Sequence, residues 1–197
     1  VLSAVHMRLE QGLLHHQPVI RANVNLFHDA DRARFLRADG IGLYRSEFPY
    51  IIRSDYLSEE EQFGIYRRIA DAMPESPLYF RTADIGGDKI LPQDVQREAN
   101  PFLGVRGIRF SLTNPAMFSD QLRAMLRAGL DRDLRIMFPM VSSIDEIHSA
   151  KEFVDSAVDS LRSDGYEFNA NPKLGAMIEL PSAVEIAEEL ADELDFL

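Results

Sequence analysis

Apolar runs of strand length alternate along this chain with segments of helical periodicity. The period-2 and apolar runs predict strands at 18–25, 41–47, 78–84, 134–140 and 173–180, and a further strand that begins at 195–197. The 3.6-residue periods predict helices at 4–15, 29–37, 58–73, from 115 to at least 126, at 147–161 and at 181–193. This alternation is typical of an α/β protein with a parallel sheet.

Several of the expected strands end in a charged residue. Arg45 and Arg81 close two of them and Glu179 closes a third, while Arg106 lies in a long segment, 85–107, that has no clear period. In a parallel barrel, ligand-binding residues gather where the strands end. Arginines together with a carboxylate at that edge would suit a small polyanion and a divalent metal ion.

The pattern leaves two architectures open. Five strand–helix units and the start of a sixth are too few for a closed eight-stranded barrel, and an open doubly wound sheet fits the same alternation. Charged residues on several different strand ends favour the truncated barrel, because an open sheet would collect them beside one switch point. The long segment 85–107 is unusual in a compact domain unless it has a function.

Each candidate residue also has a plain structural interpretation. Arg45 could form a surface salt bridge with Glu47, and Arg81 could form an ion pair with Asp84. Glu179 follows three apolar residues and is expected to be partly buried, which is costly unless the carboxylate is paired or holds a metal ion. From the residues alone, both interpretations of Glu179 stay open.

Composition narrows the functional class. The 197 residues carry a net charge of −11, which argues against nucleic acid or an anionic membrane surface as the main partner. There is no cysteine, so neither a disulfide nor a thiolate metal site is available, as is usual for a cytoplasmic protein. No apolar run approaches the ~18 residues of a membrane span. The segment Gly86-Gly87-Asp88-Lys89 could approach a phosphate, but it lacks the spacing of a nucleotide-binding loop.

Five motifs in register resemble the phosphoenolpyruvate (PEP)-utilising enzymes. They are GLYRSEF at 42–48, RTADIGGDK at 81–89, NPFLGVRGIR at 100–109, IMFPM at 136–140 and MIELPS at 177–182. Their order and spacing resemble enzyme I of the bacterial phosphotransferase system from about residue 18 to the end. Val105, Gly107 and Ala83 depart from the family's usual Trp, Ala and larger apolar residue. The segment 105–109, together with Phe48-Pro49-Tyr50, is more similar to the nitrogen-related paralogue.

The resemblance implies a role for each motif residue. Arg45 and Arg81 would bind the phosphoryl group of PEP, with Lys89 adding charge nearby. Arg106 would be catalytic and would steady the phosphate and the enolate oxygen as the P–O bond opens. Glu179 would be one of two carboxylate ligands of Mg²⁺. The implied fold is a (β/α)8 TIM barrel truncated after about five units, with an N-terminal helix at 1–17 and the partial PEP-binding barrel at 18–197.

The resemblance also implies an activity and partners. The parent enzyme would transfer phosphate from PEP to a protein histidine, leaving pyruvate, and from there to a small phosphocarrier protein. The second metal ligand, a further arginine, a proton-donating cysteine and the histidine domain are expected outside this chain, which alone should be inactive. Cut strand edges and the family's own homodimer predict self-association. Alternatives are another PEP or pyruvate barrel (dikinase, PEP synthase or Mg²⁺-dependent lyase) or a non-catalytic self-association module.

Overall fold

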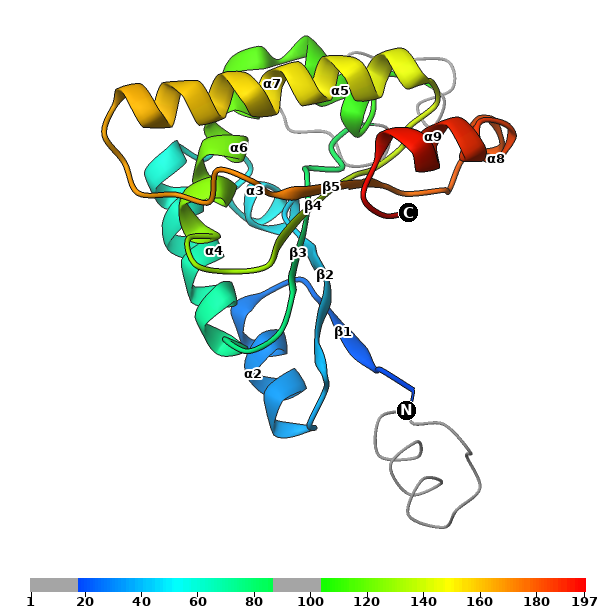
Figure 1. Ribbon diagram of the computed structural model, residues 1–197. Helices are drawn as coiled ribbons and strands as arrows, with labels where there is room; N and C mark the ends of the chain where they lie inside the picture. The colour runs from blue at the N-terminus through cyan, green and yellow to red at the C-terminus, as the bar shows by residue number, and fades with distance from the viewer. Residues whose placement is uncertain (1–17, 87–103) are drawn as a thin grey trace.

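One parallel sheet organises the protein. The computed structural model describes residues 18–86 and 104–197. Its strands are β1 (Arg21–Val24), β2 (Gly40–Arg45), β3 (Leu78–Arg81), β4 (Leu134–Phe138) and β5 (Lys173–Ala176). They lie in chain order and every neighbouring pair is parallel (Figure 1). A doubly wound sheet would reverse its strand order, so that alternative is excluded for the described strands. These strands form an open sheet and not a closed barrel.

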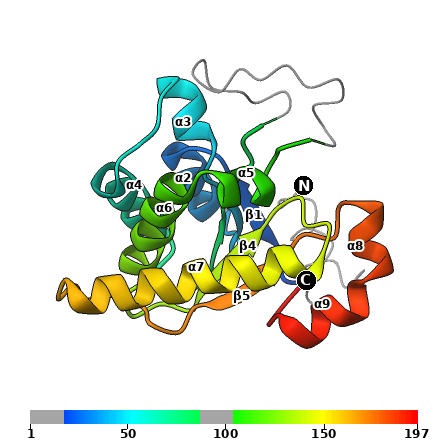
Figure 2. The ribbon, with the colours of Figure 1, turned by 90° about the horizontal axis from the view of Figure 1, so that it is seen from above.

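Helices connect the strands and cover one face of the sheet. They are α2 (Phe27–Phe35), α3 (Phe48–Arg53), α4 (Glu59–Ala72), α5 (Ile108–Thr113), α6 (Pro115–Ala128), α7 (Ile144–Ser163), α8 (Pro181–Glu185) and α9 (Ala187–Glu193). Helices α2, α4, α6 and α7 pack against one another in that order, and α8 and α9 follow β5 at the far edge (Figures 1 and 2). Right-handed crossovers in a sheet without an order reversal place their helices on the same side.

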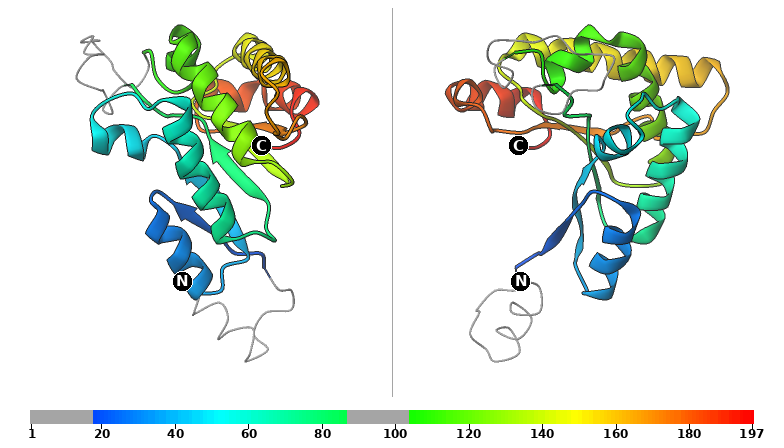
Figure 3. Two further views of the ribbon diagram at one scale, coloured as in Figure 1. Left: turned by 90° about the vertical axis from the view of Figure 1, so that its left-hand side faces the viewer. Right: turned by 180° about the vertical axis from the view of Figure 1, so that it is seen from behind.

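The core lies between that face and the helices, whose position on the sheet can be followed in two further views (Figure 3). In β4, Leu134, Ile136 and Phe138 are buried in the core, whereas Arg135 and Met137 alternate with them and are only partly buried. This is the period of two that a strand imposes on its side chains. Several polar and charged residues are also buried, among them Ser46, Glu47, Gln62, Arg81, Asp84 and Gln121.

The five expected strands and the expected helices between 29 and 193 are found with shifted bounds: the strands are shorter, whereas α7 is longer than expected. The capping boxes that open α4 and α7 are present, Ser58 with Glu61 and Ser143 with Glu146. The sequence pattern missed α3 and α5, and the helix expected at 181–193 is interrupted at Ile186. The sixth strand is represented by one parallel bridge between Phe196 and Gly175. The helix expected at 4–15 lies outside the described residues. No helix in 18–86 or 104–197 is both long and apolar enough to cross a membrane.

Candidate functional site

The ends of β2 and β3 bring two of the predicted arginines side by side. Arg45 and Arg81 are the last residues of their strands and are partners in the parallel register. Arg81 is only 5% exposed and Arg45 is partly buried. Because parallel strands end at the same edge, both guanidinium groups belong to the edge where ligands bind in α/β proteins.

Two buried carboxylates hold Arg81. Its Nη2 donates to Glu47 Oε1 at 2.5 Å and lies 3.5 Å from Asp84 Oδ2. Glu47 is fully buried and Asp84 nearly so. The ion pair between Arg81 and Asp84 is therefore confirmed. Glu47 pairs with Arg81, whereas Arg45 forms no salt bridge within the described residues.

Asp84 joins a third arginine to this cluster. Arg106 Nε donates to Asp84 Oδ1 at 2.8 Å and Arg106 Nη2 donates to Asp84 Oδ2 at 3.0 Å. Such a two-pronged pair fixes the guanidinium plane as well as its position. The structure thus links Arg81 and Arg106 through one carboxylate, although they are 25 positions apart in the sequence.

A glycine lets the two arms of the long loop meet. Gly86 forms an antiparallel bridge with Arg106, and Gly107 N–H donates to the Ile85 carbonyl at 2.9 Å. A Cβ at Gly86 would lie 2.2 Å from the Val105 carbonyl oxygen, and its φ of +108° suits glycine. The pairing of these two segments places Arg106 at the edge of the sheet, beside Asp84. Lys89, the fourth predicted anion-binding residue, lies outside the described residues.

Some arginine N–H groups at this edge lack an oxygen acceptor. The Nε atoms of Arg45 and Arg81 are buried without a hydrogen-bond partner in the described part of the chain. Arg81 Nη1 is 3.6 Å from Met177 Sδ, a weak acceptor. Buried charged donors are normally satisfied. An anion with several oxygens would satisfy them.

A fully buried network of polar groups holds the backbone at the end of β3, beside Arg45 and Arg81 at the C-terminal edge of the sheet (the arginine edge). Ser46 Oγ donates to the Arg81 carbonyl at 2.6 Å, and Gln121 Nε2 donates to Ser46 Oγ at 3.1 Å. Gln121 Oε1 accepts the Ala83 N–H at 2.9 Å. The backbone on both sides of Thr82 is therefore fixed through one glutamine of α6.

The network continues away from the sheet through tyrosines. Gln121 Nε2 also donates to Tyr66 Oη at 3.1 Å, while Tyr66 and Tyr50 donate to Gln62 Oε1 at 2.9 and 2.7 Å. Burial raises the pKa of the Tyr66 and Tyr50 hydroxyls well above the ordinary value, so both stay neutral donors. Sequence reasoning missed these residues. The sequence did hold a signal for them: Gln62 and Gln121 lie on the apolar faces of α4 and α6.

Glu179 lies on a different part of the same edge. Its Oε1 accepts the N–H of Met140, the residue two positions beyond β4, at 2.8 Å. Met140 has a positive φ of 59°, a strained conformation for a non-glycine residue. The expectation that Glu179 is partly buried is wrong, because its side chain is exposed. Glu179 lies beyond the end of β5 at Ala176, and among the described residues the segment at 195–196 bonds only to the strand itself, at Leu174 and Ala176.

The described residues supply few ligands for a metal ion. No group of three or more His, Asp or Glu side chains that could hold a metal ion occurs in 18–86 and 104–197. Glu179 uses one carboxylate oxygen for the Met140 N–H, which leaves its other oxygen able to bind a cation. One such oxygen fits a Mg²⁺ site in which one or two carboxylates hold the ion together with oxygens of the substrate.

Comparisons with known proteins agree on one family. The family described as PEP-utilising enzyme, PEP-binding domain, matches residues 8–197. The chain is 43% identical over 182 residues to the phosphoenolpyruvate-protein phosphotransferase of Staphylococcus carnosus, covering 92% of this chain and 32% of that protein. Over the same length it is 42% identical to the protein of that name from Haemophilus influenzae, again 32% of it. The chain spans about a third of these relatives, and it belongs to the PEP-binding domain family of the PEP-utilising enzymes.

Proposed function

We propose that this chain is the PEP-binding part of a phosphoenolpyruvate–protein phosphotransferase. The observation that carries the proposal is the set of buried N–H groups of Arg45 and Arg81 that lack an oxygen acceptor within the described residues, at the C-terminal edge of the sheet. The relatives named above support the reaction class. Arg45 and Arg81 bind the phosphoryl oxygens, and Lys89 adds positive charge.

Glu47 and Asp84 fix the positions of Arg81 and Arg106 before a phosphate binds. Both carboxylates hold Arg81, and Asp84 also grips Arg106, so these guanidinium groups need no reorganisation when a phosphate arrives. Phosphoryl transfer depends mainly on such positioning and on neutralising oxygen charge. Arg106 steadies the phosphate and the enolate oxygen as the P–O bond opens. The negative charges of Glu47 and Asp84 offset the positive charges of Arg81 and Arg106. The positive charge of Arg45 then attracts the anion.

The proposal includes Mg²⁺, held by Glu179 with oxygens of the substrate and a second carboxylate from elsewhere in the protein. The ion, when bound, neutralises phosphoryl and enolate oxygens. Through its hydrogen bond to Glu179, Met140 holds the carboxylate in place beside the end of β4. Glu179→Gln in the longer protein should then remove Mg²⁺-dependent turnover without loss of the fold.

Further parts of the proposal concern the whole protein. The matched relatives are about three times as long as this chain, and the remainder carries the acceptor histidine, from which a small phosphocarrier protein takes the phosphate. Additional strands beside Phe196 continue the sheet into a TIM barrel, and the domain forms a homodimer in the cytoplasm. The pathway served is sugar uptake or its nitrogen-related counterpart.

The test is calorimetry of this chain with PEP and with sulfate. Arg45→Gln is the sharpest variant, because Arg45 has no ion-pair partner in the described part of the chain and its loss strands no carboxylate. Removing Arg81 would instead take an ion-pair partner from the buried Glu47, at a cost of about 3–5 kcal/mol. The matched control is Arg21→Gln, since Arg21 begins β1 at the opposite end of the sheet and contacts Tyr79.

We expect Arg45→Gln to weaken PEP binding about tenfold or more, as loss of a charge-assisted hydrogen bond does. Arg21→Gln should bind like the parent chain. Equal binding by Arg45→Gln and the parent, or equal losses in both variants, would refute the shared anion site. Sulfate bound as tightly as PEP would show a phosphate site without recognition of the carboxylate.

A further inference from the structure

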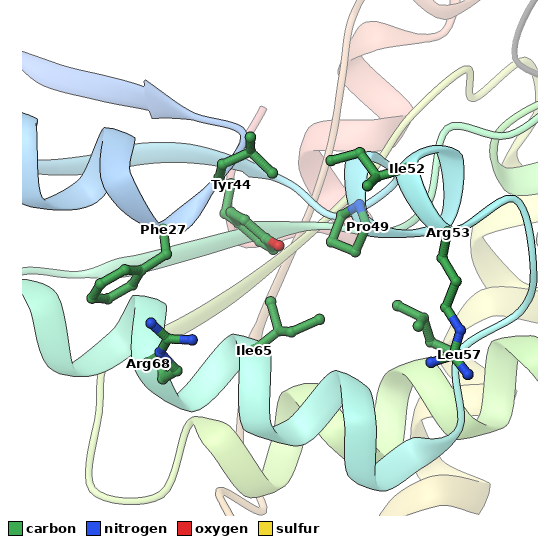
Figure 4. Close-up of a pocket in the computed structure, with 9 residues that line it drawn as sticks. Phe27, Tyr44, Pro49, Ile52, Arg53, Leu57, Ile65 and Arg68 are labelled. Carbon is green, nitrogen blue, oxygen red and sulfur yellow. The ribbon is translucent and has the colours of Figure 1, made fainter.

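A cavity of about 350 Å³ lies apart from the arginine edge, on the helix-covered side of the sheet (Figure 4). Its walls come from α2, α3 and α4, with Phe27, Pro49 and Ile65 among the lining residues, and Tyr44 of β2 lies at its base. None of the predicted phosphate-binding arginines lines it. Its volume is in the range of natural small-molecule pockets, and its wall is largely apolar.

The Tyr44 hydroxyl is a hydrogen-bonding group without a partner among the described residues. Tyr44 is 1% exposed, and its hydroxyl points into the cavity (Figure 4). It makes no hydrogen bond within 18–86 or 104–197. Edge contacts with Tyr66 and Phe80, at centroid distances of 5.8 and 5.6 Å, hold the ring in this orientation. Water or a ligand in the cavity can reach this hydroxyl, and a ligand with a polar group placed there would bond to it.

The charges at the two ends of the cavity differ. Arg53 is paired with Glu61. Arg68 has no carboxylate partner among the described residues, and its guanidinium lies over the ring of Phe27, 4.2 Å from the centroid. Stacking orients the guanidinium plane and leaves its N–H edge able to bind a carboxylate. The cavity therefore has one uncompensated positive end.

From these features we infer that the cavity binds a small amphipathic carboxylate with an aromatic or branched apolar body. The body lies between Ile65, Leu57 and Pro49, the carboxylate reaches Arg68, and a polar group on the body bonds to the Tyr44 hydroxyl. A bicyclic aromatic acid has the right size and shape. The inference does not rest on the proposed PEP chemistry, because the two sites share no side chain.

The probe for this site is 6-hydroxy-2-naphthoate, which combines a flat apolar body, a carboxylate and a hydroxyl. Binding to this chain is measured by calorimetry beside the neutral 2-naphthol. Arg68→Gln should weaken naphthoate binding about tenfold, as loss of a charge-assisted hydrogen bond does. Arg67→Gln, on the same turn of α4, is the matched control, since Arg67 pairs with Asp71 and does not line the cavity.

Two further variants test shape and hydrogen bonding. Ile65→Trp should abolish binding by filling the cavity, and Tyr44→Phe should weaken it about three- to tenfold, with circular dichroism confirming that each variant is folded. Should Ile65→Trp fail to fold, Tyr44→Phe, the Arg68 pair and the neutral probe decide the outcome. The inference is overturned if naphthoate shows no saturable binding, if 2-naphthol binds equally well, or if Arg67→Gln loses as much affinity as Arg68→Gln.

Discussion

Gln121→Leu should destabilise the protein strongly, although Gln121 is not one of the proposed PEP-binding residues. Gln121 is fully buried and makes three hydrogen bonds, to the Ala83 N–H, Ser46 Oγ and Tyr66 Oη. Leucine has a similar size but offers none of them. The stranded Ala83 N–H costs about 1–3 kcal/mol and each other lost bond about 0.5–1.5 kcal/mol. The expected loss is thus about 2–6 kcal/mol, a large fraction of an ordinary domain's ~5–15 kcal/mol.

The assay is urea unfolding followed by circular dichroism, in which a lower midpoint at constant slope reports a loss of stability. Ser156→Leu is the control, because Ser156 is an exposed residue of α7 and should change the free energy of unfolding by less than about 0.5 kcal/mol. Gln121→Leu should also weaken PEP binding, since the backbone beside Arg81 loses its anchor. A loss below about 1 kcal/mol, or one matched by Ser156→Leu, would refute the network as a support.

Two further predictions concern the loop base and a surface carboxylate. Gly86→Ala should destabilise the protein by about 1–3 kcal/mol in urea unfolding, because the new Cβ would meet the Val105 carbonyl oxygen at a positive φ. The control is Gly64→Ala, which lies in open space on α4 and should stabilise the protein by about 0.5–1 kcal/mol. Equal effects of the two substitutions would refute the steric argument. The pKa of Glu61 is lowered to about 2, chiefly by its hydrogen bond to Arg53. Its stabilising effect is present above the unfolded pKa of ~4.3 and lost as pH falls toward 2. An NMR titration of Glu61 should show this pKa rising in Arg53→Gln, and an unchanged pKa would contradict the pairing.

Local patterns determined most of the secondary structure. The apolar period of β4 and the capping boxes at Ser58 and Ser143 depend on neighbouring residues, so they can be read directly from the chain. The short helices α3 and α5 could not be read in this way. Six residues carry too little periodicity, and a helix of that length is stable mainly through tertiary packing, as where Tyr50 bonds to Gln62 of α4.

The candidate site was predicted only in part. Strand ends were enough to bring Arg45 and Arg81 to one edge, because parallel strands end together. The exposed side chain of Glu179 was not foreseen, since burial depends on which strand stands beside β5. The partners of the arginines depended on chain segments far apart in sequence.

Tertiary structure decided which polar groups pair and which do not. Glu47 pairs with Arg81 across 34 positions, and Gln121 reaches Ser46 across 75. Tyr44 is left facing a cavity because α2, α3 and α4 do not close over it. Composition and period specify how much apolar surface must be buried. Which donor meets which acceptor is set by the register of the strands and the packing of the helices, and these exist only once the chain has folded.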